Sequence, residues 1–281
     1  AALHRTGNTR KAMVQSDEPS LRRLKPDRID LLWVHMPDGV TPVDEIVRGL
    51  DDLARAGKIL YGGLSDFPAW RVATAATLAE LRHQAPIAAV QLEYSLVERT
   101  AERELLPMAG AFGLATVAWS PLGGGLLTGK YRQGETGRAQ GLGAVIHGES
   151  DARKTATLDA VLAVARELDR PPGQVAIAWV LARGVLPILG PRTPAQLADN
   201  LAAATLTLSS DQLQRLEAAS AITLGFPHDT VAGNRASLFG GHAQRVDIDQ
   251  REVGPVLDVH GDPLGGGFRS QRPRRVAEQD A

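Results

Sequence analysis

The 281-residue sequence contains no cysteine, which excludes several kinds of chemistry at once. Disulfide bonds, thiolate nucleophiles, zinc fingers and iron–sulfur ligation all need this side chain. No apolar run approaches the roughly 18 residues of a membrane-spanning helix. The first residues, AALHRTGNTRK, lack the apolar stretch of a secretory signal peptide. We therefore expect a cytoplasmic protein with no membrane partner.

The chain has no excess of charge of either sign. Its 31 Lys and Arg residues nearly match its 32 Asp and Glu residues, for a formal net charge of -1. This balance gives no electrostatic reason to expect a nucleic-acid partner. Hydrophobic residues make up 43% and charged residues 22% of the chain, near the globular average, which excludes disorder throughout. The length fits one or two domains, and a single α/β barrel can use most of it.

Common nucleotide and hydrolase motifs are also missing. No GxGxxG follows an apolar run, so a Rossmann dinucleotide site is unsupported. Walker A, HExxH and GxSxG motifs do not occur. The glycine run at 123–125 is not a P-loop, because no Lys followed by Ser or Thr stands at the required spacing.

Five short apolar runs alternate with longer segments of helical periodicity. The runs are mostly apolar on both faces, which is typical of parallel strands covered on both sides. They lie at 28–34, 59–64, 87–92, 114–119 and 186–190. Apolar spacing predicts helices over about 10–24, 42–56, 68–82, 98–111, 155–168, 173–182, 194–203 and 209–219. The alternation predicts βαβ crossovers and a parallel sheet. Five units suit an open doubly wound sheet, whereas a closed barrel needs eight, so both remain open.

Local signals predict ends and interruptions. Thr41 followed by Pro42 predicts an N-cap and the first residue of a helix. The glycine-rich segment 123–150 is too long for an ordinary connection, which is typical of functional or mobile loops. Residues 246–281 are rich in Gly, Pro and Arg and predict a disordered C-terminal tail.

Polar side chains follow the first three predicted strands, where ligands gather in parallel α/β folds. His35 could act as an acid, a base or a hydrogen-bond donor, or could be a hydrogen-bonded strand-end residue. Ser65, Asp66 and Gln91 could hold an amide through complementary donors and acceptors. Alternatively, Ser65 and Asp66 could cap the helix that follows.

The last two strand ends could hold a flat ring and an anion. Trp119 offers an indole face for stacking, and the glycines after it let the backbone approach a ligand closely. Lys130, which follows the glycines, could pair with a phosphate. The alternative for this whole segment is that Trp119 belongs to the core and the residues after it form a mobile loop. Arg192 stands at the start of a predicted helix, where N–H groups and a guanidinium form an anion site. The alternative there is a capped surface helix.

Together these segments resemble the aldo-keto reductase family from about residue 8 to residue 245. The motifs are IDLLWVHMPDGVTPVDE, AGKILYGGLSDF, VQLEYSLVERTAERELLPMA, WSPLGGGLLTGKY and PILGPRTPAQLADNLAA. The resemblance implies an α/β fold, the (β/α)8 TIM barrel of aldo-keto reductase type. It implies NADPH-dependent reduction of an aldehyde or ketone to an alcohol by hydride transfer, with a small carbonyl compound as partner. No metal is expected, and the resemblance does not give the oligomeric state.

The resemblance also implies roles for individual residues. His35 matches the active-site histidine that hydrogen-bonds the substrate carbonyl, and Trp119 matches the aromatic residue that stacks on the nicotinamide. Arg192 matches the reader of the 2′-phosphate, which favours NADP over NAD. Asp66 stands where the family more often has Asn. The other matches hold the nicotinamide carboxamide (Ser65 and Gln91), the pyrophosphate (Ser120, Leu122, Gly124 and Lys130) and the adenosine end (Gly190, Gln196 and Asn200).

Part of the family's catalytic tetrad has no counterpart here. The tetrad is Asp, Tyr, Lys and His, and the first three lie on the family's first three strands. His35 falls on what would be the fourth strand, and no Met begins the chain. We therefore expect residues 1–245 to form strands 4–8 of a barrel whose first three βα units are missing. Such a chain alone is expected to be inactive, and the alternatives are a non-catalytic NADP(H)-binding sensor or regulatory module and an inert fragment.

Overall fold

The computed structural model describes residues 7–134, 148–149, 151–238 and 240, so the predicted tail lies outside the described residues. One parallel sheet runs through it in the order β1-β2-β3-β4-β5. The strands are β1 (Ile29–Val34), β2 (Ile59–Ser65), β3 (Ile87–Glu93), β4 (Ala115–Trp119) and β5 (Leu186–Pro187). The α-helices are α1 (Arg10–Leu24), α2 (Val43–Arg55), α3 (Ala69–Leu81), α4 (Leu105–Ala111), α5 (Ala152–Leu168), α6 (Pro172–Ala182), α7 (Pro194–Leu201), α8 (Ser210–Ser220) and α9 (His228–Leu238). Short 3-10 helices are η2 (Thr100–Glu102), η3 (Gly123–Thr128), η4 (Lys130–Gln133) and η7 (Ala202–Thr205).

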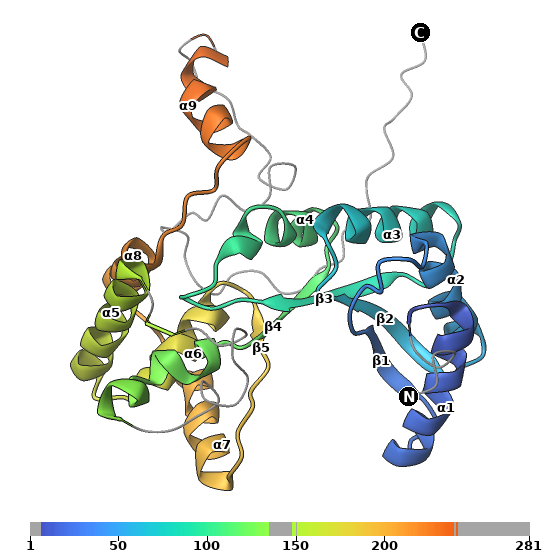
Figure 1. Ribbon diagram of the computed structural model, residues 1–281, viewed down its shortest axis with the longest axis horizontal. Coiled ribbons are helices and arrows are strands. Elements are labelled where there is room, and N and C mark those ends of the chain that lie inside the picture. The colour runs from blue at the N-terminus through green and yellow to red at the C-terminus, as the bar shows by residue number, and fades with distance from the viewer. Residues whose placement is uncertain (1–6, 135–147, 150, 239, 241–281) are drawn as a thin grey trace, which may run out of the picture.

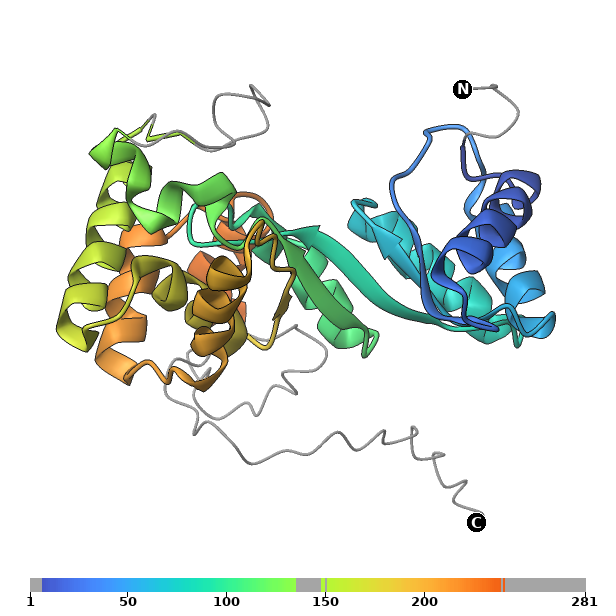
Figure 2. The same cartoon turned by 90° about the horizontal axis from the view of Figure 1, so that it is seen from below.

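The strand order favours one of the two predicted architectures. A doubly wound sheet reverses its order at a switch point, whereas a barrel adds each strand beside the previous one. Here every strand pairs in parallel with its neighbour in sequence. In Figure 1, α3 and α4 lie along one side of β3, and in Figure 2, α1 and α2 lie at one end of the sheet with α5 to α8 at the other. The sheet is consistent with a (β/α)8 barrel, and among the described residues its pairing ends at β1 and β5.

Two neighbouring glycines of β2 identify the two faces of the sheet. A Cβ on Gly62 would lie 2.8 Å from Cδ1 of Leu50 on α2, so Gly62 faces the helices. A Cβ on Gly63 would lie 2.6 Å from the indole of Trp33, its register partner on β1. Successive residues of a strand point to opposite faces. We call the face that bears Trp33 the inner face and the face against α2 the outer face.

The hydrophobic core lies on the outer face, between the sheet and its helices. On α2, the residues Ile46, Val47, Leu50 and Leu53 are at most 2% exposed. Their spacing gives α2 the single apolar side expected of a helix that covers a sheet. By contrast, every residue of α6 from Gly173 to Val180 is buried, so this helix is enclosed by its neighbours.

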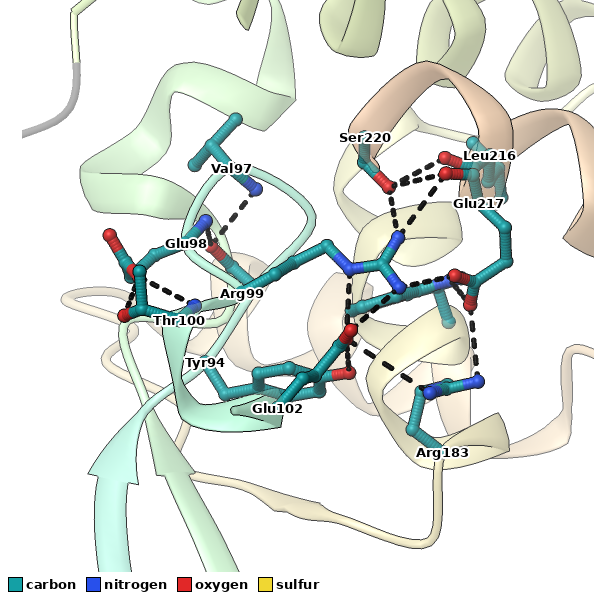
Figure 3. Close-up of polar contacts among 12 residues, drawn as sticks. Tyr94, Val97, Glu98, Arg99, Thr100, Glu102, Arg183, Leu216, Glu217 and Ser220 are labelled. Carbon is teal, nitrogen blue, oxygen red and sulfur yellow. Dashed lines mark hydrogen bonds and ion pairs between the residues drawn. The ribbon is translucent and has the colours of Figure 1, made fainter. Parts of the chain in front are cut away.

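Four charged side chains are buried where η2, α6 and α8 meet (Figure 3). Arg99 forms a two-pronged pair with Glu102, with distances of 2.8 and 2.9 Å, and its Nη2 lies 2.5 Å from Oε2 of Glu217. Arg183 lies 3.3 Å from the other oxygen of Glu217. All four side chains are less than one-fifth exposed. The two positive and two negative charges balance, which removes most of the cost of burying each one.

Two aromatic residues complete this buried cluster. The Tyr94 hydroxyl donates to Glu102 at 2.6 Å, and Trp179 Nε1 donates to Glu217 at 3.0 Å. The two rings lie 5.2 Å apart. Burial, together with the negative charge of Glu102, raises the pKa of Tyr94. The phenol therefore stays protonated and keeps donating its hydrogen bond.

Most predicted elements are confirmed, and the exceptions have local causes. The helix predicted over 98–111 is wrong, because the chain forms η2 and then the shorter α4. Pro107 explains the break: its ring would clash with the carbonyl four residues earlier, so it fits only in the first turn of α4. The strand predicted over 186–190 is shorter in the structure: β5 ends at Pro187, and one further hydrogen bond to β4 follows, from Ile188 N–H to the Ala118 carbonyl at 2.7 Å.

Two helix ends also differ from prediction. Thr41 is not the N-cap of α2, because Pro42 takes that position without a side-chain cap. Helix α9 was not predicted, since none of its residues is buried and it has no apolar stripe to detect. No helix in the described ranges is long and apolar enough to cross a membrane.

Replacing Gly62 with Ala is expected to lower the free energy of unfolding by about 1–3 kcal/mol. The added methyl would overlap Leu50, which is 1% exposed and has no room to move. Urea unfolding followed by circular dichroism measures the change. Gly233→Ala on α9 is the control, because nothing lies within 4 Å of its added Cβ. Equal unfolding midpoints for both variants would contradict the packing argument.

Replacing Glu217 with Gln is expected to lower the free energy of unfolding by about 3–5 kcal/mol, because Arg99 and Arg183 lose one of the two carboxylates that they share. Glu167→Gln removes the partner of Arg215 from an exposed ion pair and serves as the matched control, with little or no change expected. The same denaturation assay compares the two. Similar small losses in both variants would show that the buried cluster is not a stability determinant.

Candidate functional site

The carboxyl ends of the first four strands carry predicted site residues on the inner face. Ser65 pairs with Gln91 across β2 and β3, and Glu93 pairs with Trp119 across β3 and β4. His35 directly follows β1, at the position that continues the inner row of that strand. The side-chain period of two therefore brings these residues to one end of one face.

Asp66 links three of these strands through hydrogen bonds. Its Oδ1 accepts from Trp119 Nε1 at 2.9 Å, and its backbone N–H donates to the Gln91 carbonyl at 2.9 Å. The Ser65 hydroxyl, which is fully buried, donates to Asp66 Oδ2 at 3.4 Å. The prediction that Ser65 and Asp66 cap the next helix is wrong, because Pro68 is the N-cap of α3 and no side chain caps it.

The backbone of Asp66 has a φ of +58°. Residues other than Gly rarely adopt this left-handed conformation, and Asp and Asn tolerate it best. Strained conformations of this kind cluster at functional sites, where surrounding contacts hold them in place. Ser120, at the end of β4, has the same conformation with a φ of +57°. Two strand ends that face the same site thus share an uncommon backbone geometry.

Three consecutive glycines bend the segment after β4. Gly123, Gly124 and Gly125 all have positive φ, and Gly124 N–H donates to the Ser120 hydroxyl at 3.1 Å. Lys130 folds over this bend, because a Cβ on Gly125 would lie 2.9 Å from its Cε. A bend of successive N–H groups beside an ammonium can hold a phosphate anion. Here, however, the N–H groups of Gly123 and Gly125 donate to the carbonyls of Ser120 and Leu122, and that of Gly124 donates to the Ser120 hydroxyl. The pyrophosphate role therefore stays a prediction that rests on Lys130, and a side chain at Gly125 would displace this lysine.

Two interpretations of the Arg192 segment were open, an anion site at a helix start and a capped surface helix, and the start of α7 is compatible with both. Thr193 is the N-cap, and its hydroxyl accepts from Gln196 N–H at 3.2 Å. The Gln196 side chain in turn accepts from Arg192 N–H at 2.8 Å. Arg192 is exposed beside this capped helix start. A capped surface helix and an anion-binding helix start are therefore compatible here.

The predicted residues fall into two groups in the structure. One group surrounds Asp66 and Trp119, and the other surrounds Arg192 on α7. No hydrogen bond among the described residues joins the two groups. Helix α7, which carries the second group, is held to α6 by a hydrogen bond of 2.8 Å from Gln174 to Asp199. Gly190 is exposed, while Leu122 and Asn200 are half-buried, and these three residues stay predictions as cofactor contacts. The described ranges contain no group of three or more His, Asp or Glu residues that could hold a metal ion.

Asp38 shapes the loop that follows His35, and the sequence analysis did not single it out. Its carboxylate accepts backbone N–H groups of Asn8, Val40 and Thr41 and also the Thr41 hydroxyl, at 2.5–3.0 Å. Burial opposes ionisation, but these hydrogen bonds outweigh it and hold the pKa of Asp38 well below its usual range. A Pro-Asp-Gly sequence is a known turn signal and could have revealed this role.

The geometry first defines a class: an α/β protein with parallel strands in sequential order and a polar and aromatic strip across their carboxyl ends. Comparison with known proteins then identifies the family. The Aldo/keto reductase family model matches residues 2–221. The chain belongs to this family.

Several curated proteins are similar to the chain. "Uncharacterized oxidoreductase YrpG" of Bacillus subtilis is 40% identical over 201 residues, covering 71% of this chain and 60% of that protein. "Norsolorinic acid reductase" of Aspergillus flavus is 33% identical, with 79% and 56% covered. "Probable aryl-alcohol dehydrogenase AAD4" of Saccharomyces cerevisiae is 31% identical, with 86% and 77% covered. The chain thus spans less than two thirds of the first two relatives.

Replacing Asp38 with Asn is expected to lower the free energy of unfolding by about 2 kcal/mol at neutral pH, because a charged acceptor of four hydrogen bonds becomes neutral. The folded-state pKa lies below the unfolded one, so this stabilisation is complete above the unfolded pKa of about 4 and is lost as the pH falls towards the folded value. Urea unfolding from about pH 7 to about pH 3 should show the two proteins converging on the acid side. A difference that does not change with pH would contradict the role of the charge.

Proposed function

We propose that this protein is an NADP(H)-dependent oxidoreductase that reduces an aldehyde or ketone to an alcohol. The observation that carries the proposal is the inner-face strip in which Asp66 hydrogen-bonds both Trp119 and the Gln91 backbone. When bound, NADPH supplies a hydride to the carbonyl carbon while a proton reaches the carbonyl oxygen, which gives the alcohol and NADP⁺. Family membership supports the reaction class.

The chain's own residues suit binding and orientation. Trp119 offers an indole whose edge is fixed by its hydrogen bond to Asp66, so its face can stack on a planar ring. Gln91 lies on the same face and can pair with a carboxamide. Ser65 is buried against Asp66, so its proposed contact with the same amide requires the pair to separate.

His35 is exposed at the end of β1, where it can donate a hydrogen bond to a substrate carbonyl. Met36, which follows it, is 55% exposed and offers an apolar surface beside that position. The names of the yeast and Aspergillus relatives refer to an aryl alcohol and to norsolorinic acid. We therefore propose carbonyl compounds with an apolar, aromatic body as the substrate class.

We further propose that the 281-residue chain alone binds NADP(H) with negligible turnover. His35 is the one residue of the family tetrad that the motif match supplies, and it leaves the Tyr that donates the proton and its Lys partner without counterparts. General acid catalysis of this kind contributes about 10²–10⁴-fold. Among the described residues the sheet pairing ends at β1 and β5, and this favours the same interpretation, because the strand-end pocket of an open sheet has fewer walls.

Replacing Arg192 with Ala is expected to weaken NADPH binding about tenfold or more and to leave NADH binding unchanged, because a charge-assisted contact to the 2′-phosphate is lost. Fluorescence titration with each cofactor measures both constants. Arg170→Ala, which removes an exposed Arg beyond the end of α5, is the control. An equal loss for NADPH and NADH would rule out Arg192 as the 2′-phosphate reader.

Replacing Trp119 with Ala is expected to weaken NADPH and NADH about equally, since the stacked ring is common to both. Absorbance at the reduced-nicotinamide band, with benzaldehyde as substrate, tests turnover by the unmodified chain. Unchanged cofactor affinity in Trp119→Ala would overturn the site assignment. Rapid benzaldehyde-dependent oxidation of NADPH would overturn the proposal of negligible turnover.

A further inference from the structure

The hydrogen bond between Trp119 and Asp66 places a negative charge on the edge of the indole. The donor is Trp119 Nε1 and the acceptor is Asp66 Oδ1, at 2.9 Å. The Ser65 hydroxyl donates to Oδ2 of the same carboxylate at 3.4 Å. The Asp66 backbone N–H donates to the Gln91 carbonyl and fixes the main chain. The Asp66 carboxylate therefore has a fixed position in the wall on which the nicotinamide is proposed to stack.

A second carboxylate lies close by on the same face. Glu93 is the register partner of Trp119 and is half-buried. Glu93 takes part in interactions of its own, so we assign the main effect to Asp66, whose contact with the indole is direct. Lys130 is the cation of the neighbouring glycine loop, and it lies over Gly125 and the Tyr131 ring.

The two redox forms of a nicotinamide differ in charge. Loss of a hydride removes two electrons and one proton from the neutral reduced ring and leaves a ring of charge +1. A carboxylate near this ring attracts the oxidised form and has little effect on the reduced form. An indole whose N–H donates to a carboxylate also carries more negative charge on its face, which strengthens its attraction for a cation stacked on it. Both effects act in the same direction.

We propose that Asp66 makes this site bind the oxidised, positively charged nicotinamide in preference to the reduced, neutral one. The inference rests on the proposed NADP(H) function and specifies its regulation. The ratio of NADP⁺ to NADPH then decides which of the two forms occupies the site. An uncharged amide at the same position would keep the hydrogen bond to the indole without this selectivity.

The test is the substitution Asp66→Asn, which keeps an acceptor oxygen and a side chain that tolerates positive φ. We expect the ratio of the NADPH dissociation constant to the NADP⁺ dissociation constant to fall about tenfold, as removal of a unit charge near the ring predicts. Asp169→Asn is the matched control, because Asp169 has a φ of +50° and is exposed at the end of α5. Asp66→Gly, which also accepts positive φ, is the second variant if the first does not fold.

A second experiment, with small nicotinamide compounds in place of the dinucleotides, tests this inference separately from the proposed function. Neutral nicotinamide and the 1-methylnicotinamide cation lack the pyrophosphate and the adenosine, so they probe the indole wall alone. Quenching of Trp119 fluorescence, with Trp119→Phe as the baseline, is expected to be stronger for the cation in the unmodified chain. The preference should disappear in Asp66→Asn and persist in Asp169→Asn.

Each result decides between the two proposals. If both dinucleotides bind and their ratio is the same in Asp66→Asn, the inference is overturned and the proposed function stands. If neither dinucleotide binds the unmodified chain, the proposed function is overturned, and the small probes decide the inference. A cation preference that depends on Asp66 then supports it, and equal quenching by both probes overturns it.

Discussion

The candidate site depends on one constraint, the in-order parallel pairing of neighbouring strands. Each strand lies beside the next with its carboxyl end at the same edge, and the side-chain period of two fixes which residues share a face. The pairs Ser65–Gln91 and Glu93–Trp119 follow directly from that register. A shift of one residue in the register of any strand pair would move the polar strand-end side chains to the outer face, among the core residues. The packing of the core on the outer face therefore also fixes which side chains lie on the inner face.

The charged groups of the protein serve two different purposes. In the buried cluster, Arg99 and Glu217 neutralise one another, and the contact joins the connection after β3 to α8. At the strand ends, Asp38 and Asp66 are satisfied by N–H and O–H donors, and no cation is among their hydrogen-bond partners in the described residues. The first arrangement fixes the positions of distant helices, while the second holds negative charge at the mouth of the candidate site.

The fold could be predicted from the sequence to a large extent, because strand and helix periodicity are local signals. The positions of β1 to β4 and of α1 match their apolar runs closely. What could not be predicted depends on distant contacts. Arg99 and Glu217, which form this buried pair, lie 118 positions apart in the sequence, and no spacing rule reveals the contact. The predicted fourth-strand identity of β1 and the predicted disorder of 246–281 stay predictions.

The candidate site shows the same division. Motifs identified Asp66 and Trp119 separately, but their hydrogen bond required the register of β2, β3 and β4. Asp38 was missed because its partners lie partly on the segment before α1, at Asn8. The alternative of a helix cap at Ser65 and Asp66 was wrong, since a proline occupies the N-cap and the two side chains bond to each other instead.

The two ends of the sheet are not equivalent as templates for a further strand. β1 has six residues, none of them proline, so the backbone N–H and C=O groups along the edge that faces away from β2 can pair with a strand of the same length. β5 has two residues and one of them is Pro187, which offers few groups for pairing. Within the part of the chain that the structure describes, β1 is therefore the longer template for a further strand and β5 the shorter one.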